Sequence, residues 1–144
     1  MKVYQISEFV KNLSEIKSDL SGGRVTICIE HLIRLAVFQN SQNKNHWRTE
    51  VYASFHSIPK IKGNNKLMKP QDIFDCVWHS CGDMLDAYVE CILKDEPNEI
   101  VTTSDLNEVT NKVLRYIRWL ANKLGTKGVI DSQSVYNKLE ELEL

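Results

Sequence analysis

Residues 24–40, which read RVTICIEHLIRLAVFQN, decide the fold of this chain. In a helical projection this stretch is apolar almost all round, and only Thr26, Glu30 and Arg34 form a narrow polar edge at four-residue steps. A helix that is apolar on nearly every side belongs in the interior of a protein. We therefore predict a buried central helix that contains Ile27–Phe38.

Helical periodicity continues on both sides of the central stretch, with apolar residues at steps of three and four. It predicts further helices at about residues 6–20, 45–58, 70–94 and 105–124, and a short one from about 132. The apolar stripes include Ile6, Val10 and Leu13; Trp47, Val51 and Phe55; Ile73, Val77, Leu85 and Ile92; Val109, Val113, Leu120 and Leu124; and Val135, Leu139 and Leu142. The chain 1–144 is therefore predicted to be a single all-α domain, a bundle of five or six helices. A short strand in the β-branched run Val25-Thr26-Ile27 is the alternative at the start of the central helix.

Residue types with known positional preferences mark the ends of these helices. Pro70 opens one helix, since proline is favoured in the first turn. Ser104 is the predicted N-cap of the next helix, and Gly125 ends it. Asp131 or Ser132 caps the last helix.

The composition is that of one soluble globular domain. The chain has 144 residues, of which 42% are hydrophobic and 26% charged, with 18 Lys and Arg against 19 Asp and Glu. No apolar run approaches the roughly 20 residues that cross a bilayer, and the first residues do not resemble a secretion signal. We therefore expect a cytoplasmic protein without a membrane partner.

Charge is distributed unevenly along the chain. Residues 1–72 carry 11 basic and 6 acidic side chains, whereas residues 73–144 carry 7 and 13. We expect helices from the two halves to pack side by side and neutralise each other. The lysine-rich stretch 60–69 has no acidic residue and is expected to be an exposed, mobile loop. Four cysteines are expected to remain thiols in a cytoplasmic protein: Cys28, Cys76, Cys81 and Cys91.

Two motifs lie in and after the central helix: His31-Leu32-Ile33-Arg34-Leu35 and, beyond a polar stretch, His46-Trp47-Arg48-Thr49-Glu50-Val51. With these motifs the chain resembles a bacterial family of helical proteins, the domain-of-unknown-function family number twenty-nine. The resemblance covers about residues 13–67, and the acidic, Gly-Arg-containing stretch that usually precedes the histidine is missing. It implies an α-helical fold and no particular activity.

Five possible metal ligands follow one another at steps of three and four in the predicted helix 70–94: Cys76, His79, Asp83, Asp86 and Glu90. At this spacing they project from one stripe, and paired carboxylates on bundle helices can build di-metal sites. The stripe lies opposite the apolar arc of the same helix, however, whereas a site in a bundle core must face the neighbouring helices. We therefore expect a solvated acidic face with no metal or cofactor, and a metal-binding bundle is the alternative.

Two further patterns keep that alternative open. Cys28 and His31 repeat the Cys-x-x-His spacing of Cys76 and His79, so the two pairs would complete a tetrahedral zinc site if their helices faced each other. The ordinary interpretation is a buried Cys28 and a hydrogen-bonded His31 at the edge of the apolar face. The segment Gly82–Asp86 is similar to the Asp-x-x-Asp half of all-α nucleotide pyrophosphohydrolases, but their Glu-x-x-Glu half is absent. A metal-dependent hydrolase of that type is therefore part of the same alternative.

No motif for covalent catalysis or for phosphate binding is present, so no catalytic residues are assigned. A nucleic-acid-binding regulator is the second alternative, because Lys112, Arg115 and Arg118 are predicted on the outer side of helix 105–124. The pI of about 6.4 does not favour binding to a duplex.

Trp119 and Arg115 are the residues that we expect to contact a partner. Both project from the side of their helix that is opposite the apolar stripe. Trp and Arg are the residue types that anchor protein interfaces, and Arg115 is placed to lie over the indole ring. The alternative is that the last helix folds back and covers Trp119. We predict a small, cytoplasmic, non-catalytic binding or regulatory module that uses helix faces to contact another protein or a second copy of itself.

Overall fold

The computed structural model describes residues 24–55, 62–63, 66–67, 69–81, 84–103, 105–126 and 130–144. The predicted helix at residues 6–20 lies outside this part of the chain. The described helices are α2 (Arg24–Val37), α3 (Lys44–Phe55), α4 (Pro70–Cys81), α5 (Leu85–Asp95), α6 (Leu106–Leu124) and α7 (Ser132–Glu141). The predicted all-α bundle is thus confirmed, with six helices in the described part.

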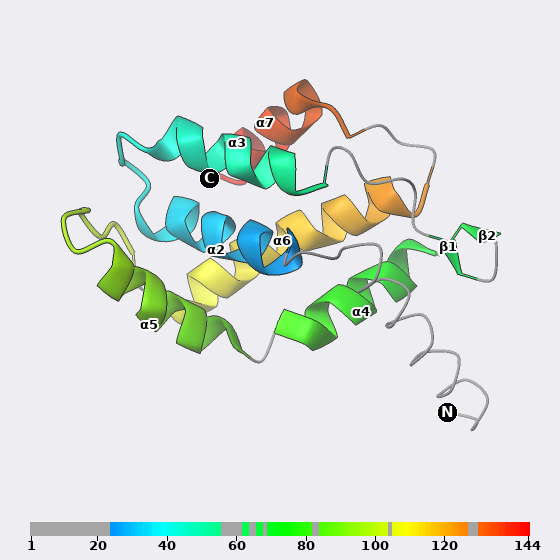
Figure 1. The fold of residues 1–144 in the computed structure, drawn as a ribbon, viewed down its shortest axis with the longest axis horizontal. Coiled ribbons are helices and arrows are strands. Elements are labelled where there is room, and N and C mark those ends of the chain that lie inside the picture. The colour runs from blue at the N-terminus through cyan, green and yellow to red at the C-terminus, as the bar shows by residue number, and fades with distance from the viewer. Residues whose placement is uncertain are drawn as a thin grey trace.

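Helix α2 occupies the centre of the bundle. It contacts α3, α4, α5 and α6, and Figure 1 shows α3 and α7 on one side of it and α4 and α5 on the other. Its completely buried residues are Cys28, Ile29, Leu32, Ile33, Leu35, Ala36 and Val37, followed by Phe38. The predicted central helix is therefore confirmed, and the β-branched run at its start is helical rather than extended.

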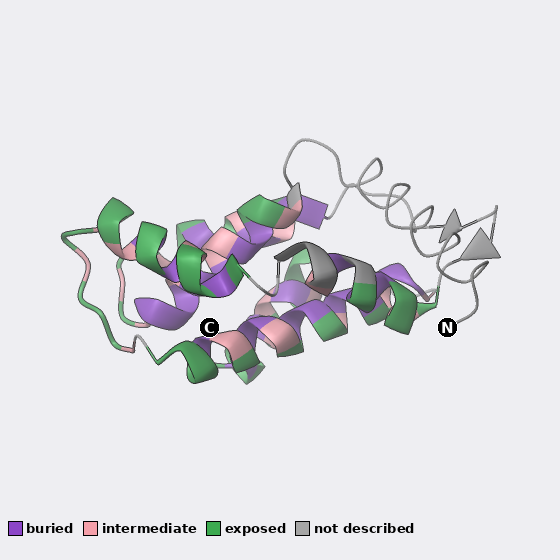
Figure 2. Ribbon diagram, turned by 90° about the horizontal axis from the view of Figure 1, so that it is seen from below, coloured by how far each residue is buried: buried purple, intermediate pink, exposed green. Residues whose placement is uncertain are grey.

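The surrounding helices each bury one face. Buried residues line the inner sides of the ribbons and exposed residues the outer sides (Figure 2). In α3 the buried residues include Trp47, Val51 and Phe55, which are the predicted stripe. Helix α4 begins at Pro70, as predicted. None of α2–α7 combines the length and the apolar character that a bilayer crossing requires.

The prediction of one helix over residues 70–94 was wrong, because α4 ends at Cys81 and α5 begins at Leu85. Glycine is a poor helix former, and Gly82 directly follows Cys81 in the sequence. Packing favours the division as well: α4 packs mainly against α6, whereas α5 packs against both α2 and α6. An uninterrupted apolar arc did not reveal the break, since each half buries its own part of that arc.

A hairpin of two short strands, each two residues long, was also not predicted. Strand β1 (Lys62–Gly63) pairs antiparallel with β2 (Lys66–Leu67) inside the stretch that was expected to be a loop. Lysine and glycine are weak strand formers, so the pattern gives no strand signal.

The helix ends agree closely with the predicted caps. The N-cap of α6 is Asp105, one residue after the predicted Ser104, and its carboxylate accepts a hydrogen bond from the Asn107 amide at 3.0 Å. Gly125 ends α6, and Asp131 caps α7 in a capping box with Ser134. Aspartate and serine are equally good N-caps, so the sequence alone did not separate the two adjacent positions before α6.

Ion pairs join the two halves of the chain, as the charge distribution predicts. The Arg34 guanidinium on α2 lies 3.2 Å from Glu96 and 3.7 Å from Asp95, at the end of α5. The Arg48 guanidinium on α3 lies 3.7 Å from Glu140 on α7. These arginines come from the basic half and all three carboxylates from the acidic half.

The α7 cap gives a pH-dependent prediction. Hydrogen bonds from the backbone amide and the hydroxyl of Ser134 lower the pKa of Asp131 below its ordinary value of 3.8. Because the folded pKa is depressed, the stabilisation is complete above the unfolded pKa and is lost as the pH falls through the folded pKa. Asp131→Asn keeps a hydrogen-bond acceptor at this position, but its side chain does not titrate. We therefore expect the difference in stability between the wild type and this variant to become smaller as the pH falls. Melting temperatures of the two proteins from neutral to acid pH check this, and a difference that does not change with pH would contradict it.

Candidate functional site

A cleft of about 470 Å³ opens between α4, α6 and α7. Its lining residues are Pro70, Gln71 and Phe74 from α4, Arg115, Arg118, Trp119 and Asn122 from α6, and Lys138 from α7. The volume lies within the range of about 300–1,000 Å³ that is usual for ligand sites. The two residues predicted to contact a partner, Arg115 and Trp119, therefore lie together in one cleft.

The α6 wall of the cleft is a single stripe of the helix. Arg115, Arg118, Trp119 and Asn122 are spaced at i, i+3, i+4 and i+7, so they lie above one another on one side. The opposite side of α6 carries the buried residues Val109, Val113, Tyr116, Ile117, Leu120, Ala121 and Leu124. The predicted division of this helix into an apolar stripe and a contact stripe is consistent with this arrangement.

Arg118 rests on an aromatic surface. Its guanidinium carbon lies 4.2 Å from the centroid of the Phe74 ring on α4, and Phe74 stacks in turn on Trp78 with the rings 5.9 Å apart and inclined by 9°. The N–H groups of a guanidinium lie in its own plane and point outward from its edge, so they can still bind an anion when the face of the group rests on a ring. Sequence reasoning placed Arg118 on the outer side of its helix but gave no signal for Phe74, which comes from a distant segment.

Trp119 is half-buried in the wall of the cleft. Its ring packs against Tyr116 at 5.5 Å, and the ammonium group of Lys123 lies 5.8 Å from the indole centroid. The cation beside the indole is therefore Lys123. The prediction that Arg115 lies over the indole ring was wrong. Lys138 of α7 lines the same cleft, so the last helix reaches the cleft, and Trp119 remains partly exposed there.

The cleft is basic. Among the described residues, no carboxylate lines the cleft, and neither Arg115 nor Arg118 forms a hydrogen bond or an ion pair. Two arginines elsewhere in the described part of the chain are neutralised: Arg34 pairs with Asp95 and Glu96, and Arg48 with Glu140. Two guanidinium groups without an acidic partner are therefore concentrated at one place on a protein whose net charge is −1.

Acidic side chains near the rim have partners of their own. The Asp75 carboxylate accepts a hydrogen bond from Gln71 at 2.8 Å, and Glu141 pairs with Lys138 at 3.2 Å. Each of these interactions joins two residues that are three or four positions apart in the same helix, one pair in α4 and the other in α7. They leave the positive charge of Arg115 and Arg118 uncompensated.

The prediction that Lys112 lies on the outer side of its helix was wrong, because Lys112 is only 9% exposed. Its ammonium group donates a hydrogen bond to the Glu143 main-chain oxygen at 3.3 Å and lies 4.0 Å from Glu108. The chain after α7 covers this part of α6, and the helical projection of α6 alone carried no sign of that contact. Lys112 therefore belongs to the packing of the C-terminal segment and not to the cleft.

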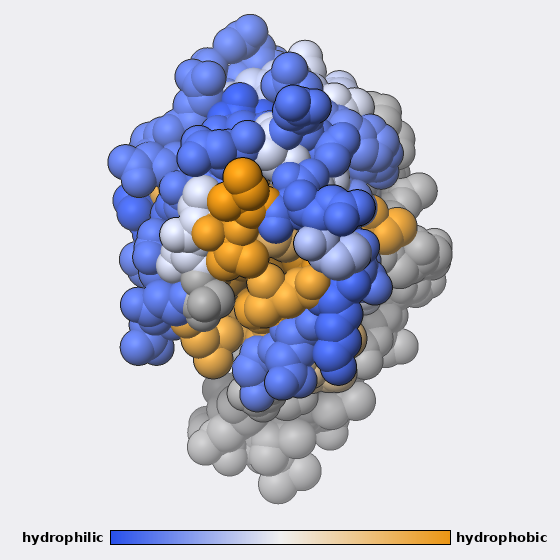
Figure 3. Space-filling model, turned by 90° about the vertical axis from the view of Figure 1, so that its left-hand side faces the viewer, coloured by the Kyte–Doolittle hydropathy of each residue, from blue (hydrophilic) through white to orange (hydrophobic). Residues whose placement is uncertain are grey.

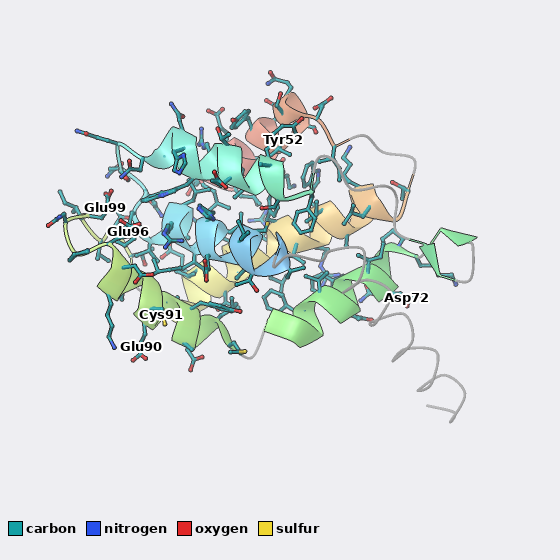
Figure 4. All side chains as sticks on the ribbon, viewed as in Figure 1. Tyr52, Asp72, Glu90, Cys91, Glu96 and Glu99 are labelled. Carbon is teal, nitrogen blue, oxygen red and sulfur yellow. The ribbon has the colours of Figure 1, made fainter. Side chains whose placement is uncertain are left out.

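The stripe of possible metal ligands, which was predicted on one helix, is divided between α4 and α5. The side chains of Cys76 and His79, and the whole of Asp83, lie outside the described residues. Asp86 and Glu90 are exposed on α5, and Figure 4 shows Glu90 pointing away from the bundle. Within the described part of the chain, no three His, Cys, Asp or Glu side chains are grouped so that they could hold a metal ion.

Cys28 and His31 have the ordinary roles that were predicted for them. Cys28 is completely buried, and His31 is half-buried with its Nδ1 2.7 Å from the Ile27 main-chain oxygen. The tetrahedral zinc site predicted as an alternative needs Cys76 and His79 as well, and their side chains lie outside the described part.

A second, polar hollow of about 430 Å³ lies at the other end of the molecule, where the α2–α3 turn meets the connection between α5 and α6. It is lined by Asn40, Ser41, Gln42, Asn43, Asn98, Glu99 and Ile100. The Glu99 carboxylate accepts hydrogen bonds from Ser41 and Asn43, both at 2.8 Å. These bonds fasten the connection to the bundle, so the hollow is a structural junction.

Comparison with known proteins does not place the chain in a class. No protein-family model matches it, and no curated protein or solved structure is significantly similar to it. The similarity to the helical family described above is therefore an expectation from two motifs. The cleft and its chemistry are the basis for assigning a function.

Proposed function

We propose that this protein is a cytoplasmic, non-catalytic binding module that captures an acidic segment of a partner protein in the cleft between α4, α6 and α7. The observation that carries the proposal is the pair of guanidinium groups of Arg115 and Arg118 beside the half-buried ring of Trp119. Neither guanidinium has an acidic partner in the part of the chain that the structure describes. Arg and Trp are the residue types that contribute most to binding at protein interfaces.

The chemistry of the cleft defines the ligand. A guanidinium binds a carboxylate through two parallel hydrogen bonds, and Arg118 loses little freedom on binding because Phe74 already holds it at 4.2 Å. The exposed part of Trp119 offers an apolar contact next to these charges. We therefore propose a ligand segment in which acidic residues flank an apolar side chain.

Single-stranded nucleic acid is the second candidate. Aromatic side chains that stack with bases, beside cations that contact phosphates, are typical of such sites, and Trp119 has Arg115 and Lys123 nearby. Phe74, the other ring in the cleft, is only 7% exposed and is covered by Arg118. Trp119 is thus the one accessible ring among the described lining residues, and this favours a protein segment over a strand of stacked bases.

Fluorescence anisotropy tests the proposal with a short fluorescein-labelled peptide in which Glu and Leu alternate. We expect the wild-type chain to bind this peptide and the double variant Arg115→Ala/Trp119→Ala to bind it at least about tenfold more weakly, because interface residues of these types are each worth about 2 kcal/mol or more. Affinity should fall as salt is added, since the exposed charges are screened. Circular dichroism verifies that the variant is folded.

Matched controls separate the cleft from general charge effects. Lys94→Gln removes one cation from the exposed surface of α5, far from the cleft, and should leave binding unchanged. A peptide with Lys in place of Glu should not bind. Equal binding by the wild type and the cleft variant would refute the proposal, and tight binding of labelled oligothymidylate instead of the peptide would establish the second candidate.

A further inference from the structure

The connection between α5 and α6 carries an exposed apolar patch formed by Ile100, Val101 and Leu106. These side chains are 81%, 46% and 41% exposed, and they are three of the five large hydrophobic residues exposed in the described part of the chain. Figure 3 shows apolar side chains gathered in the middle of this end of the molecule, with polar ones around them. A contiguous apolar patch rimmed by polar residues, unlike a single exposed side chain, marks a candidate contact site.

The same connection is strongly acidic. No Lys or Arg occurs between Lys94 and Lys112, and the interval contains Asp95, Glu96, Glu99, Asp105 and Glu108. Figure 4 shows Glu96 and Glu99 together at this end of the molecule, whereas Asp72 of α4 lies at the opposite end. The connection is thus a segment in which acidic residues flank exposed apolar side chains.

Hydrogen bonds hold the connection in one conformation. The Thr102 amide and hydroxyl both donate to the Val37 main-chain oxygen at 2.8 Å, and the Gln39 amide donates to the Thr102 hydroxyl at 3.0 Å. Glu96 and Glu99 are fixed by Arg34 and Ser41. A segment that is already ordered loses little entropy when it binds.

This segment has the chemistry that the cleft requires, but it cannot reach the cleft of its own molecule. Leu106 and Trp119 lie near opposite ends of α6, which at 1.5 Å per residue places them about 20 Å apart. Contact between the two surfaces therefore has to be made between two molecules.

Resting on the function proposed above, we infer that the occupant of the cleft is a second copy of this chain. It inserts Ile100 against Trp119 and presents the exposed carboxylates of its connection, those of Asp95 and Asp105, to Arg115 and Arg118. The two contacting surfaces are different parts of the chain, so the interface is heterologous and joins copies head to tail. A pair of copies therefore keeps one unused cleft, on one copy, and one unused connection, on the other, so further copies can add and assembly grows with concentration.

Sedimentation velocity of the full chain over a concentration series tests the inference. We expect the mean mass to rise with concentration and to fall when salt is added. Ile100→Ser and Arg115→Gln/Trp119→Ala should each weaken association by at least about tenfold. Since Ile100 is 81% exposed, its substitution should leave the fold intact. If the double variant is unfolded by circular dichroism, Arg115→Gln alone provides the cleft variant, because Arg115 is exposed.

Mixing the two variants is the decisive measurement. Ile100→Ser keeps a working cleft, and the cleft variant keeps a working connection, so an equimolar mixture should form a complex with one copy of each. A monomeric wild type, association that neither variant weakens, or a mixture that stays monomeric would each overturn the inference. If the wild type is monomeric but binds the acidic peptide in its cleft, the proposed function holds and the occupant is a different protein; if neither association occurs, both are refuted.

Discussion

Replacing Leu32 with alanine is expected to lower the free energy of unfolding by about 2–5 kcal/mol. Leu32 is completely buried in α2, the helix that contacts α3, α4, α5 and α6. Truncation removes the apolar surface that Leu32 buries and leaves a cavity that rigid neighbours on several sides cannot close. Domains of this size have total stabilities of about 5–15 kcal/mol, so the variant should be marginally folded. Urea unfolding followed by circular dichroism measures the difference.

Ile27→Ala is the matched control for this prediction. Ile27 lies on the same helix and has the same number of carbon atoms as Leu32, but it is 38% exposed. Its truncation should cost about 1 kcal/mol or less. Equal losses at the two positions would show that helix propensity, and not burial at the centre of the bundle, sets the stability of α2.

The central helix was predictable because its signal is local. Between Cys28 and Phe38 the pattern leaves a polar edge only at Glu30 and Arg34, and both are half-buried in the structure. The paired Asp95 and Glu96 carboxylates explain how Arg34 is accommodated there. The contact stripe of α6 was predictable for the same reason, since Arg115 and Trp119 follow from the spacing within one helix.

The remainder of the cleft depends on segments that are distant in the sequence. Phe74 holds Arg118 from α4, and Lys138 approaches from α7. Neither contact follows from the pattern of a single helix, because helix packing and not helix periodicity decides which faces meet. The division of helix 70–94 into α4 and α5 was missed for the same reason. Gly82 alone does not predict a helix end, and the different packing partners of α4 and α5 cannot be read from the sequence.

The packing of Glu143 and Leu144, which follow the last apolar stripe, was not predicted from the sequence. The side chain of Arg48, which is 13% exposed, donates hydrogen bonds from Nε, at 3.0 Å, and from a terminal nitrogen to the main-chain oxygen of the completely buried Leu144. Lys112 binds the neighbouring residue, Glu143. Burial, together with the positive charge of Arg48, lowers the pKa of Lys44 in the same region. Arg48 and Lys112 thus hold main-chain oxygens of the C-terminal segment, although Lys112 was predicted to face solvent.

Arg48→Met is accordingly expected to lower the free energy of unfolding by about 1–3 kcal/mol. Methionine keeps most of the apolar stem of Arg48 but leaves the Leu144 oxygen without its two donors, and an unsatisfied buried acceptor costs about this much. Arg48→Lys keeps the charge but replaces the planar fork with a single ammonium group, so it should restore only part of the loss. Urea unfolding of the three proteins gives the values.

Lys94→Met provides the control for the loss of a positive charge, because Lys94 is exposed on α5. Surface substitutions of this kind usually change stability by no more than about 0.5 kcal/mol. If Arg48→Met were no less stable than Lys94→Met, water would be replacing the arginine at the Leu144 oxygen. If Arg48→Lys were as stable as the wild type, charge alone would hold the C-terminal segment, and the fork geometry of the guanidinium would contribute nothing to the way α3 and α7 are joined.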